Sequence, residues 1–303
     1  MKKIKSPITL SCNVELIRRY SMKWLIRRYK KSFNIDISYL LEDCGEKYLS
    51  LYRCLDTGYE FFYPFISGDS AFYEKMGQME HYYDEWKMEN EAVCPFIHPD
   101  DKVLDIGCGH GGFIDKLHKD LNVDATGIEL NTSAVQYAVS KGRKVKQELL
   151  NEHLNTHYEY YDVVCSFQVF EHVTNINEML SDSVMCLKKG GTLVISVPNN
   201  DTSVGFYKYG CGNMSPHHVG RWNEQTLRSI APYFGLKLKC IMIESVLNNR
   251  IDFAQPMMSL FFHNYYVGKI LYKLKAHLVM RSFFRKISSW LKGHTIIAVY
   301  EKK

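Results

Sequence analysis

The stretch VLDIGCGHGG, Val103 to Gly112, joins a short apolar run to a loop rich in glycine. The segment that follows it, FIDKLHKDL, carries its apolar residues at helical spacing. Together they predict a buried strand, a glycine turn and a helix. Glycine at such a turn allows the backbone to approach a ligand closely at the N-terminus of the helix. The stretch therefore predicts an α/β sheet whose first strand ends in a ligand-binding loop.

Strand and helix patterns alternate along the chain after this stretch. DATGIEL, KVKQELL, YDVVCSF and TLVISVPN have the composition of buried strands, and helix patterns such as NTSAVQYAVSKG lie between them. This alternation is typical of a mostly parallel sheet with helices on both faces. Near the end, LKLKCIMIESV and HTIIAVYEK predict two further strands. The 47 residues between them, 247–293, are too many for a bare loop, so we expect a helical insertion there.

Two ligands fit a glycine loop of this kind. The pattern GxGxxG, formed by Gly107, Gly109 and Gly112, is typical of dinucleotide binders, whereas DxGxG is typical of S-adenosylmethionine binders. Asp105 stands two residues before Gly107, where a carboxylate would repel a pyrophosphate but attract the cationic amino group of S-adenosylmethionine. Glu129, at the end of the second strand, can accept hydrogen bonds from ribose hydroxyls, which both ligands carry. Asp105 therefore favours S-adenosylmethionine, with an NAD-dependent oxidoreductase as the minor alternative.

The run from Val103 to Lys302 resembles the class I S-adenosylmethionine-dependent methyltransferases. The matching pieces, in order, are VLDIGCGHG, TGIELN, YDVVCSFQVFEHV, LKKGGTLVISVPN and HTIIAVYEKK. The resemblance implies a Rossmann-like α/β fold, with a seven-stranded, mostly parallel sheet of strand order 3-2-1-4-5-7-6 and strand 7 antiparallel. Within this family the chain is similar to methyltransferases of bacterial polysaccharide and sugar modification, which have an upstream segment like YRCLDTGYEFFYPFISGDSAFYEKM.

The resemblance also implies a set of cofactor-binding residues. Those of the glycine loop would flank the methionine moiety, and the acid after the second strand would bind the ribose. Apolar and acidic residues after the second and third strands would border the adenine, and two residues after the fourth strand would lie near the sulfonium. The set comprises Asp105, Gly107, Cys108, Gly109, Glu129, Leu130, Glu148, Leu149, Phe167 and Gln168.

Three histidines are candidate catalytic residues. His172, in VFEHV, follows the fourth strand at the edge of the sheet where ligands of open α/β sheets bind. His217 and His218, in SPHHVGRWN, follow the fifth strand in a loop rich in Gly, Asn and Pro. Transfer of a methyl group to a hydroxyl calls for a base, and imidazole suits this role near neutral pH. The alternatives are a structural hydrogen bond for His172 and loop packing for the pair.

Composition limits the cellular setting and the metal chemistry. The chain has 303 residues, 46% of them hydrophobic and 23% charged, which is enough for one large domain or two small ones. Its nine cysteines form no CxxC pattern, so reduced thiols in a cytoplasmic protein are expected. Some related sugar methyltransferases carry a zinc-binding cysteine set upstream, but this chain has only Cys44 and Cys54 there, so no metal site is expected. The sequence has neither a signal-peptide pattern nor a run of ~20 apolar residues.

The net charge of +5 is distributed unevenly. Residues 1–31 carry ten Lys or Arg and one acid, and residues 264–292 carry seven and no acid. The motif LIRRY occurs at Leu16–Tyr20 and at Leu25–Tyr29, which predicts an amphipathic helix with a basic face. A surface for a phosphate-bearing substrate or for anionic lipid is the alternative. The basic insertion before the last strand is open to three roles, as a lid, a dimer face or a membrane contact; nucleic acid is not expected, because no recognition motif accompanies the charge.

These observations predict the organisation and function of the chain. Residues 1–68 would form a basic extension with short strands within 44–66, and residues 69–303 a methyltransferase domain with an insertion at about 247–293. Asp69 would cap a helix that carries an aromatic stripe. The expected acceptor is a small polar molecule, a sugar, nucleotide sugar or lipid-linked glycan hydroxyl, carrying phosphate. Another small molecule, such as a quinone or an amine, is the alternative. We expect a cytoplasmic enzyme at the inner membrane face. The sequence leaves open whether the protein forms a homo-oligomer. A non-catalytic binding protein of the same fold is a further alternative.

Overall fold

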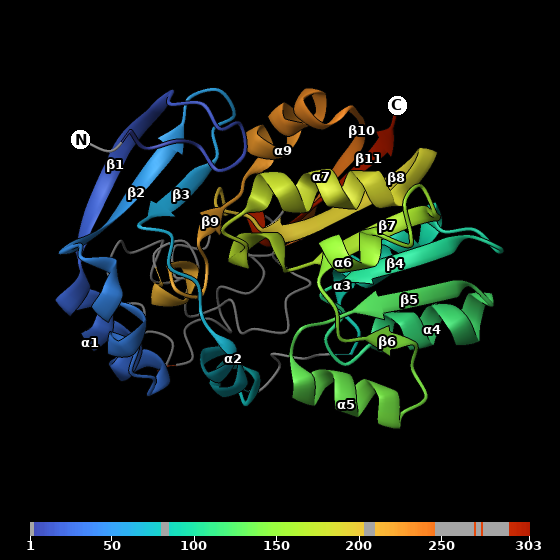
Figure 1. Ribbon diagram of the computed structural model, residues 1–303, viewed down its shortest axis with the longest axis horizontal. Coiled ribbons are helices and arrows are strands. Elements are labelled where there is room, and N and C mark those ends of the chain that lie inside the picture. The colour runs from blue at the N-terminus through green and yellow to red at the C-terminus, as the bar shows by residue number, and fades with distance from the viewer. Residues whose placement is uncertain (1–2, 80–84, 203–209, 246–269, 271–273, 275–290) are drawn as a thin grey trace.

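The structure is a computed structural model that describes residues 3–79, 85–202, 210–245, 270, 274 and 291–303. These residues form two β-sheets, one of seven strands and one of four (Figure 1). The larger sheet is mostly parallel, whereas the strands of the smaller sheet pair in antiparallel fashion. The larger sheet positions the candidate site, because the loops that follow its strands open at one edge.

The seven-stranded sheet has the order β10-β11-β8-β7-β4-β5-β6. The glycine loop follows β4, the central strand of the parallel part, and β11 runs antiparallel to both of its neighbours. Numbered along the chain within this sheet, the strands read 3-2-1-4-5-7-6, so the predicted fold and strand order are confirmed. The bounds are β4 Lys102–Ile106, β5 Asp124–Ile128, β6 Val145–Lys146, β7 Tyr161–Phe167, β8 Leu187–Pro198, β10 Leu236–Ser245 and β11 Lys292–Lys302.

Helices cover both faces of this sheet, as the alternating pattern predicted. Successive residues of a strand point to opposite faces. In β4, Val103 packs with the apolar residues of α3, α4 and α5, whereas Leu104 packs with those of α6, α7 and α9. The bounds of these helices are α3 Met88–Val93, α4 Gly112–Leu121, α5 Thr132–Ser140, α6 Leu150–Leu154, α7 Ile176–Cys186 and α9 Glu224–Ile230.

The four-stranded sheet has the order β1-β2-β3-β9 and combines distant parts of the chain. Its first three strands, which lie within residues 14–63, come from the segment that was expected to be an extension, and β9 comes from residues 220–221. Trp222, directly after β9, is fully buried and packs edge-on against Tyr59 at 4.8 Å between ring centroids. The small sheet therefore shares a core with the large one. Its strands are β1 Val14–Ser21, β2 Tyr48–Cys54, β3 Glu60–Tyr63 and β9 Gly220–Arg221.

The two LIRRY motifs have different structures. The first lies in β1 and pairs with β2, so the predicted single helix over residues 1–31 is wrong there. The second lies in the helix α1 (Met22–Phe33), where Leu25 and Tyr29 are buried four residues apart on one face. The reason for the difference is tertiary, because only the first copy lies beside a strand with which its backbone can pair.

Two further expectations concern helices. Asp69 caps α2 (Ser70–Gly77), because its carboxylate accepts a hydrogen bond from the Phe72 amide at 2.8 Å. Most of the predicted helical insertion falls on residues 246–269, 271–273 and 275–290, which lie outside the described residues. No helix in the described part of the chain is long and apolar enough to cross a bilayer.

Candidate active site

A cavity of about 1390 Å³ lies at the carboxyl edge of the large sheet. Its walls come from the segments after β4, β5, β6, β7 and β8, and from upstream residues near positions 67–74 and 85–90. The carboxyl ends of parallel strands meet at one edge, which explains why loops far apart in sequence share this cavity. All ten residues expected to bind the cofactor and all three candidate histidines line it.

The glycine loop has a left-handed backbone. Gly107, Gly109 and Gly111 have φ angles of 71°, 53° and 72°, a region that side chains disfavour. At Gly107 a Cβ atom would also lie 2.4 Å from the Val169 side chain. The amides of Gly107 and Cys108 both donate to the carbonyl of Ile128 at the end of β5. The loop is thereby held against the neighbouring strand and presents its backbone to the cavity.

Gly112 has a different role from the phosphate contact that GxGxxG implies in dinucleotide binders. A Cβ atom at Gly112 would lie 2.3 Å from the backbone oxygen of Glu85. The third glycine of the motif therefore makes room for the upstream chain, which crosses the start of α4 at this point. The pattern GxGxxG in this chain reflects packing between two segments of the protein.

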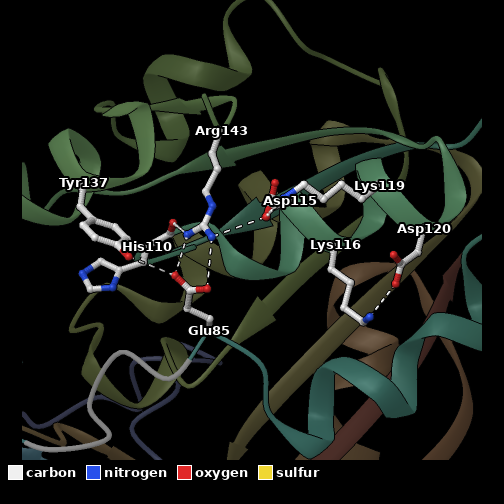
Figure 2. Close-up of polar contacts among 8 residues, drawn as sticks. All are labelled: Glu85, His110, Asp115, Lys116, Lys119, Asp120, Tyr137 and Arg143. Carbon is white, nitrogen blue, oxygen red and sulfur yellow. Dashed lines mark hydrogen bonds and ion pairs between the residues drawn. The ribbon is translucent and has the colours of Figure 1, made fainter. Parts of the chain in front are cut away.

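Arg143 fastens the same upstream segment to the glycine loop (Figure 2). Its guanidinium group donates to both carboxylate oxygens of Glu85, at 3.0 and 3.2 Å, and to the backbone oxygen of His110 at 2.6 Å. The Tyr137 hydroxyl also donates to Glu85, at 3.4 Å. The Arg143 side chain is 7% exposed, so this contact is better protected from water than the helix-surface ion pairs of Asp115 and its neighbours. Arg143 lies in a short turn without a motif, so no sequence pattern marked it as a site residue.

Asp105 is the buried acid of the cavity. Its side chain is 3% exposed, and its Oδ1 atom has no hydrogen-bond partner among the described residues. Burial, and then the nearby Glu129 carboxylate, raise the pKa of Asp105 well above its usual value. An unpaired polar atom in a buried position is costly unless a ligand satisfies it. The cavity therefore suits a ligand with a cationic or hydrogen-donating group at this point.

Glu129 shapes the loop beside Asp105. Its carboxylate accepts hydrogen bonds from the amides of Gly109 at 3.0 Å, Leu130 at 2.7 Å and Asn131 at 2.8 Å. A carboxylate offers about four lone-pair positions, so one acceptor position is left for a ligand hydroxyl. Glu129 therefore holds the glycine loop in place through these hydrogen bonds. Its position at a strand end does not reveal this role.

The opposite rim of the cavity combines exposed apolar side chains with an oriented acid. Leu130 and Leu149 are about half exposed, which is unusual for leucine and leaves apolar surface open to a flat ring. Glu148 accepts a hydrogen bond from His153 Nδ1 at 2.6 Å, and His153 Nε2 lies 2.7 Å from the Tyr161 hydroxyl. His153 is buried, so this chain fixes the position of Glu148.

Phe167 and Gln168 form the floor between the two ends of the cavity. Phe167 packs edge-on against Phe113 at 5.0 Å between ring centroids. Gln168 has a left-handed backbone with φ of 58°, and its side-chain amide donates to Ser196 Oγ at 3.1 Å. The side chain of Gln168 is therefore anchored to β8.

The three candidate histidines lie together at the other end of the cavity. Their ring centroids are 4.4 Å apart for His217 and His218, 4.7 Å for His172 and His217, and 4.9 Å for His172 and His218. Burial lowers the pKa of His172 to about 4 and that of His217 to about 3, and it lowers the pKa of His218 well below its usual value. All three imidazoles are therefore neutral at pH 7, each with one nitrogen lone pair.

Glu171 lies beside these histidines and was not selected from the sequence. It belongs to the 3-10 helix η4 (Phe170–His172), is 1% exposed and lines the cavity. Its Oε1 atom lies 3.8 Å from His172 Nε2, and its Oε2 atom has no hydrogen-bond partner in the part of the chain that the structure describes. Burial raises the pKa of Glu171 to about 8. The signal that could have identified it is an acid next to a histidine at the end of a central strand.

Comparison with known families and proteins agrees with this geometry. Residues 77–241 match a family model described as a methyltransferase domain. Among curated proteins, the ubiquinone biosynthesis O-methyltransferases of Yersinia enterocolitica and Yersinia pestis are each 29% identical to this chain, over 109 and 107 residues. Those matches cover 34% and 33% of this chain, and they span less than half of the relatives, 45% and 44% of their lengths.

Solved structures share the fold. A chain in the complex of the Haloferax volcanii Trm112 methyltransferase activator with a methyltransferase has a TM-score of 0.54 and 17% identity, covering 77% of this chain and 95% of that one. The YcgJ protein of Bacillus subtilis has a TM-score of 0.50 and 14% identity, covering 71% of this chain and 98% of that one. At these identities the likeness concerns the fold alone.

Proposed function

Since this chain belongs to the class I S-adenosylmethionine-dependent methyltransferase family, whose model covers residues 77–241, we propose that it transfers a methyl group to a small polar acceptor. The acceptor class we propose is a sugar, nucleotide sugar or lipid-linked glycan with a reactive hydroxyl. The observation that carries the proposal is the buried Asp105 carboxylate, whose Oδ1 atom has no hydrogen-bond partner among the described residues and which lines the same cavity as the three histidines.

The residues of the cavity fit S-adenosylmethionine. Asp105 would hold its cationic amino group and Glu129 a ribose hydroxyl. The open leucines after β5 and β6 would pack on the adenine, with Glu148 at its edge, and Phe167 and Gln168 would lie near the sulfonium. When bound, this cofactor supplies a methyl group on a positively charged sulfur. The protein's own task is then to align an acceptor atom and to exclude water.

The histidines would form the acceptor wall. Neutral imidazole nitrogens accept hydrogen bonds from hydroxyl groups. Burial keeps His172, His217 and His218 neutral, because it lowers the pKa of each. A hydrogen bond to one of these nitrogens would orient the acceptor hydroxyl. The same nitrogen would accept the hydroxyl proton as the bond between the acceptor oxygen and the methyl carbon forms. Ser67 and Gly68 also line the cavity, so the end of the upstream segment 1–68 would contribute to this wall.

The polarity of this end of the cavity supports a hydroxyl-rich acceptor. Its lining includes, besides the histidines, the polar side chains of Asp69, Ser70, Tyr73 and Asn175. In the part that the structure describes, the basic first 31 residues do not line the cavity. They support a position at the anionic inner face of the membrane, where a phosphate-bearing substrate would be held. A quinone-derived hydroxyl is the second candidate, and the names of the Yersinia relatives favour it.

Calorimetry with S-adenosylhomocysteine tests the cofactor assignment. We expect Asp105→Asn to weaken binding at least about 10-fold, because it removes a buried charge-assisted contact while keeping the side-chain shape. Glu129→Ala should abolish binding, because it also releases the glycine loop. Asp120→Asn, on the outer face of α4, is the matched control and should bind like the unaltered protein. Unchanged binding by both Asp105→Asn and Glu129→Ala would overturn the assignment.

The acceptor is tested separately by mass spectrometry. Purified protein with S-adenosylmethionine is incubated with nucleotide sugars, lipid-linked saccharides and quinols. We expect a mass gain of one methyl group on a saccharide acceptor. A gain only on the quinols would replace the sugar proposal by the second candidate, and no gain on any acceptor would count against both.

A further inference from the structure

We infer that His172, His217 and His218 form a binding site for a divalent transition-metal ion of the zinc class at the acceptor end of the cavity. The inference rests on the proposed function, because the metal would bind an oxygen of the methyl acceptor. It extends that function, since neither the family match nor the sequence patterns assign a metal to this chain.

The first observation is convergence. The three histidines each offer one ring nitrogen, and these atoms all lie within 4.8 Å of one another. Ligands of a tetrahedral metal ion, at bond lengths of roughly 2.1 Å, stand roughly 3.4 Å apart, so a bound ion would draw the three rings closer together. His172 comes from η4 and the other two from the loop after β8, so two separate segments meet at one point.

The second observation is the set of hydrogen bonds that orients the rings. Nδ1 of His172 lies 2.6 Å from the backbone oxygen of His217, and Nδ1 of His217 lies 2.9 Å from that of Gly212. Carbonyl oxygens only accept hydrogen bonds, so both Nδ1 atoms carry the proton and Nε2 keeps the lone pair.

His218 follows the same rule through a side chain. Its Nδ1 lies 3.0 Å from Asn213 Oδ1, and the amide nitrogen of Asn213 donates to Asn200 Oδ1 at 2.7 Å. This second bond fixes which end of the Asn213 amide faces the histidine. Metal-binding histidines in proteins are oriented in this way, with the nitrogen remote from the metal donating to an oxygen. A cation between three ring nitrogens this close together could bind all three.

The third observation is the buried carboxylate of Glu171. Its Oε1 atom lies 3.8 Å from His172 Nε2, and its Oε2 atom has no hydrogen-bond partner among the described residues. A buried oxygen atom beside three ring nitrogens would gain a partner from a cation bound there or from a molecule that the cation holds. Three imidazole nitrogens suit zinc and its neighbours better than magnesium or calcium, which prefer oxygen ligands.

The position in the cavity indicates what such a metal would do. Three protein ligands leave a coordination position open, as in catalytic rather than structural zinc sites. The histidines line the cavity, so the open position would face the acceptor. A metal ion there would bind an acceptor oxygen, orient it and make its hydroxyl more acidic.

Metal content of the full chain, purified without a polyhistidine tag, tests the inference. The protein is equilibrated with Zn²⁺, passed through a desalting column and assayed by mass spectrometry of the element. We expect one zinc per chain for the unaltered protein. His118→Asn, which alters an exposed histidine on α4, is the matched control and should also keep one zinc. His217→Asn and His218→Asn should each retain no zinc after desalting. Their affinity for zinc should fall by more than the roughly 10- to 100-fold loss that is typical when a residue that orients a ligand is changed.

Asn213→Leu provides a graded variant, because it leaves all three nitrogens in place but removes the partner of His218. We expect its zinc affinity to fall about 10-fold. Should the buried-histidine variants fail to fold, the visible spectrum of the unaltered protein with Co²⁺ decides, because nitrogen ligation changes the spectrum from that of aqueous Co²⁺. A protein that retains no Zn²⁺ and shows no Co²⁺ spectral change would overturn the inference, as would full zinc retention by folded His218→Asn.

The two proposals fail independently. S-adenosylhomocysteine binding is measured on a second sample of the same protein, treated with a chelator to remove metal. If the protein binds the cofactor but no metal, the inference fails and the proposed function stands. If it binds zinc but neither cofactor nor acceptor, the metal site stands and the proposed function fails.

Discussion

The cofactor wall and the histidine wall line the same cavity but are held in different ways. The cofactor wall, defined as Asp105–Gly109 with Glu129, is fixed by hydrogen bonds between the ends of β4 and β5. The histidine wall, defined as His172, His217 and His218, is fixed by contacts to the N-terminal part of the chain, such as the Tyr29 hydroxyl on the Met214 oxygen at 2.7 Å. Burial disfavours charge in both walls, because it raises the pKa of the Asp105 carboxyl group in the first and lowers the pKa of the histidines in the second.

This contrast predicts that the two walls respond to different changes. The cofactor wall depends on backbone geometry within one βαβ unit, so local substitutions should affect cofactor binding most. The histidine wall depends on a contact between residues 185 positions apart. Substitutions in the upstream segment should therefore disturb this wall without changing the affinity for the cofactor.

Gly107→Ala should have the largest effect. The methyl group would stand 2.4 Å from a Val169 side-chain carbon, in a backbone conformation with φ of 71°. Left-handed geometry alone costs roughly 1–2 kcal/mol for a residue with a Cβ, and the collision adds to it. We expect no measurable binding of S-adenosylhomocysteine by calorimetry. Gly142→Ala, also at positive φ but with open space around it, controls for the strain alone and should still bind.

Tyr29→Phe should have an intermediate effect that is confined to the histidine wall. The change removes two hydrogen bonds, the one that the hydroxyl donates to the Met214 oxygen and the one that it accepts from the His217 amide at 3.4 Å. Leaving these groups without their partner costs roughly 1–3 kcal/mol in the free energy of unfolding. Urea denaturation measures this loss, and calorimetry should show unchanged S-adenosylhomocysteine affinity. A large loss of cofactor affinity in this variant would mean that the two walls are coupled, which would contradict the expectation that they respond separately.

Glu85→Gln should have the smallest effect. The Glu85 side chain is about half exposed, so its ion pair with Arg143 is partly screened by water and contributes roughly 1 kcal/mol or less. We expect a few-fold weaker affinity for S-adenosylhomocysteine, because the upstream segment is held less firmly to the glycine loop. The difference from the unaltered protein should shrink as salt is added. A salt-independent loss would indicate that the contact acts through shape and not through charge.

Much of the fold and of the cofactor wall could be predicted, because both depend on short-range patterns. The alternation of strands and helices followed from apolar runs, and the strand order from the family resemblance. Asp105 and Glu129 could be selected because each stands at a strand end, and both line the cavity. Arg143 could not be predicted in the same way, because no motif marks the turn that contains it. Glu171 and the convergence of the histidines were also hidden, since they depend on how the loop after β8 folds back onto η4.

The sequence by itself determined the α/β sheet, the glycine loop and the acid beside it, because alternating apolar runs and glycine positions act within a few residues of one another. Only the tertiary structure decided which LIRRY motif became a strand and which a helix. Five identical residues adopt both forms, and the choice follows from the presence of β2 beside the first copy. It also decided that Gly112 accommodates Glu85 and that three distant histidines share one wall, because such contacts exist only once the chain has folded.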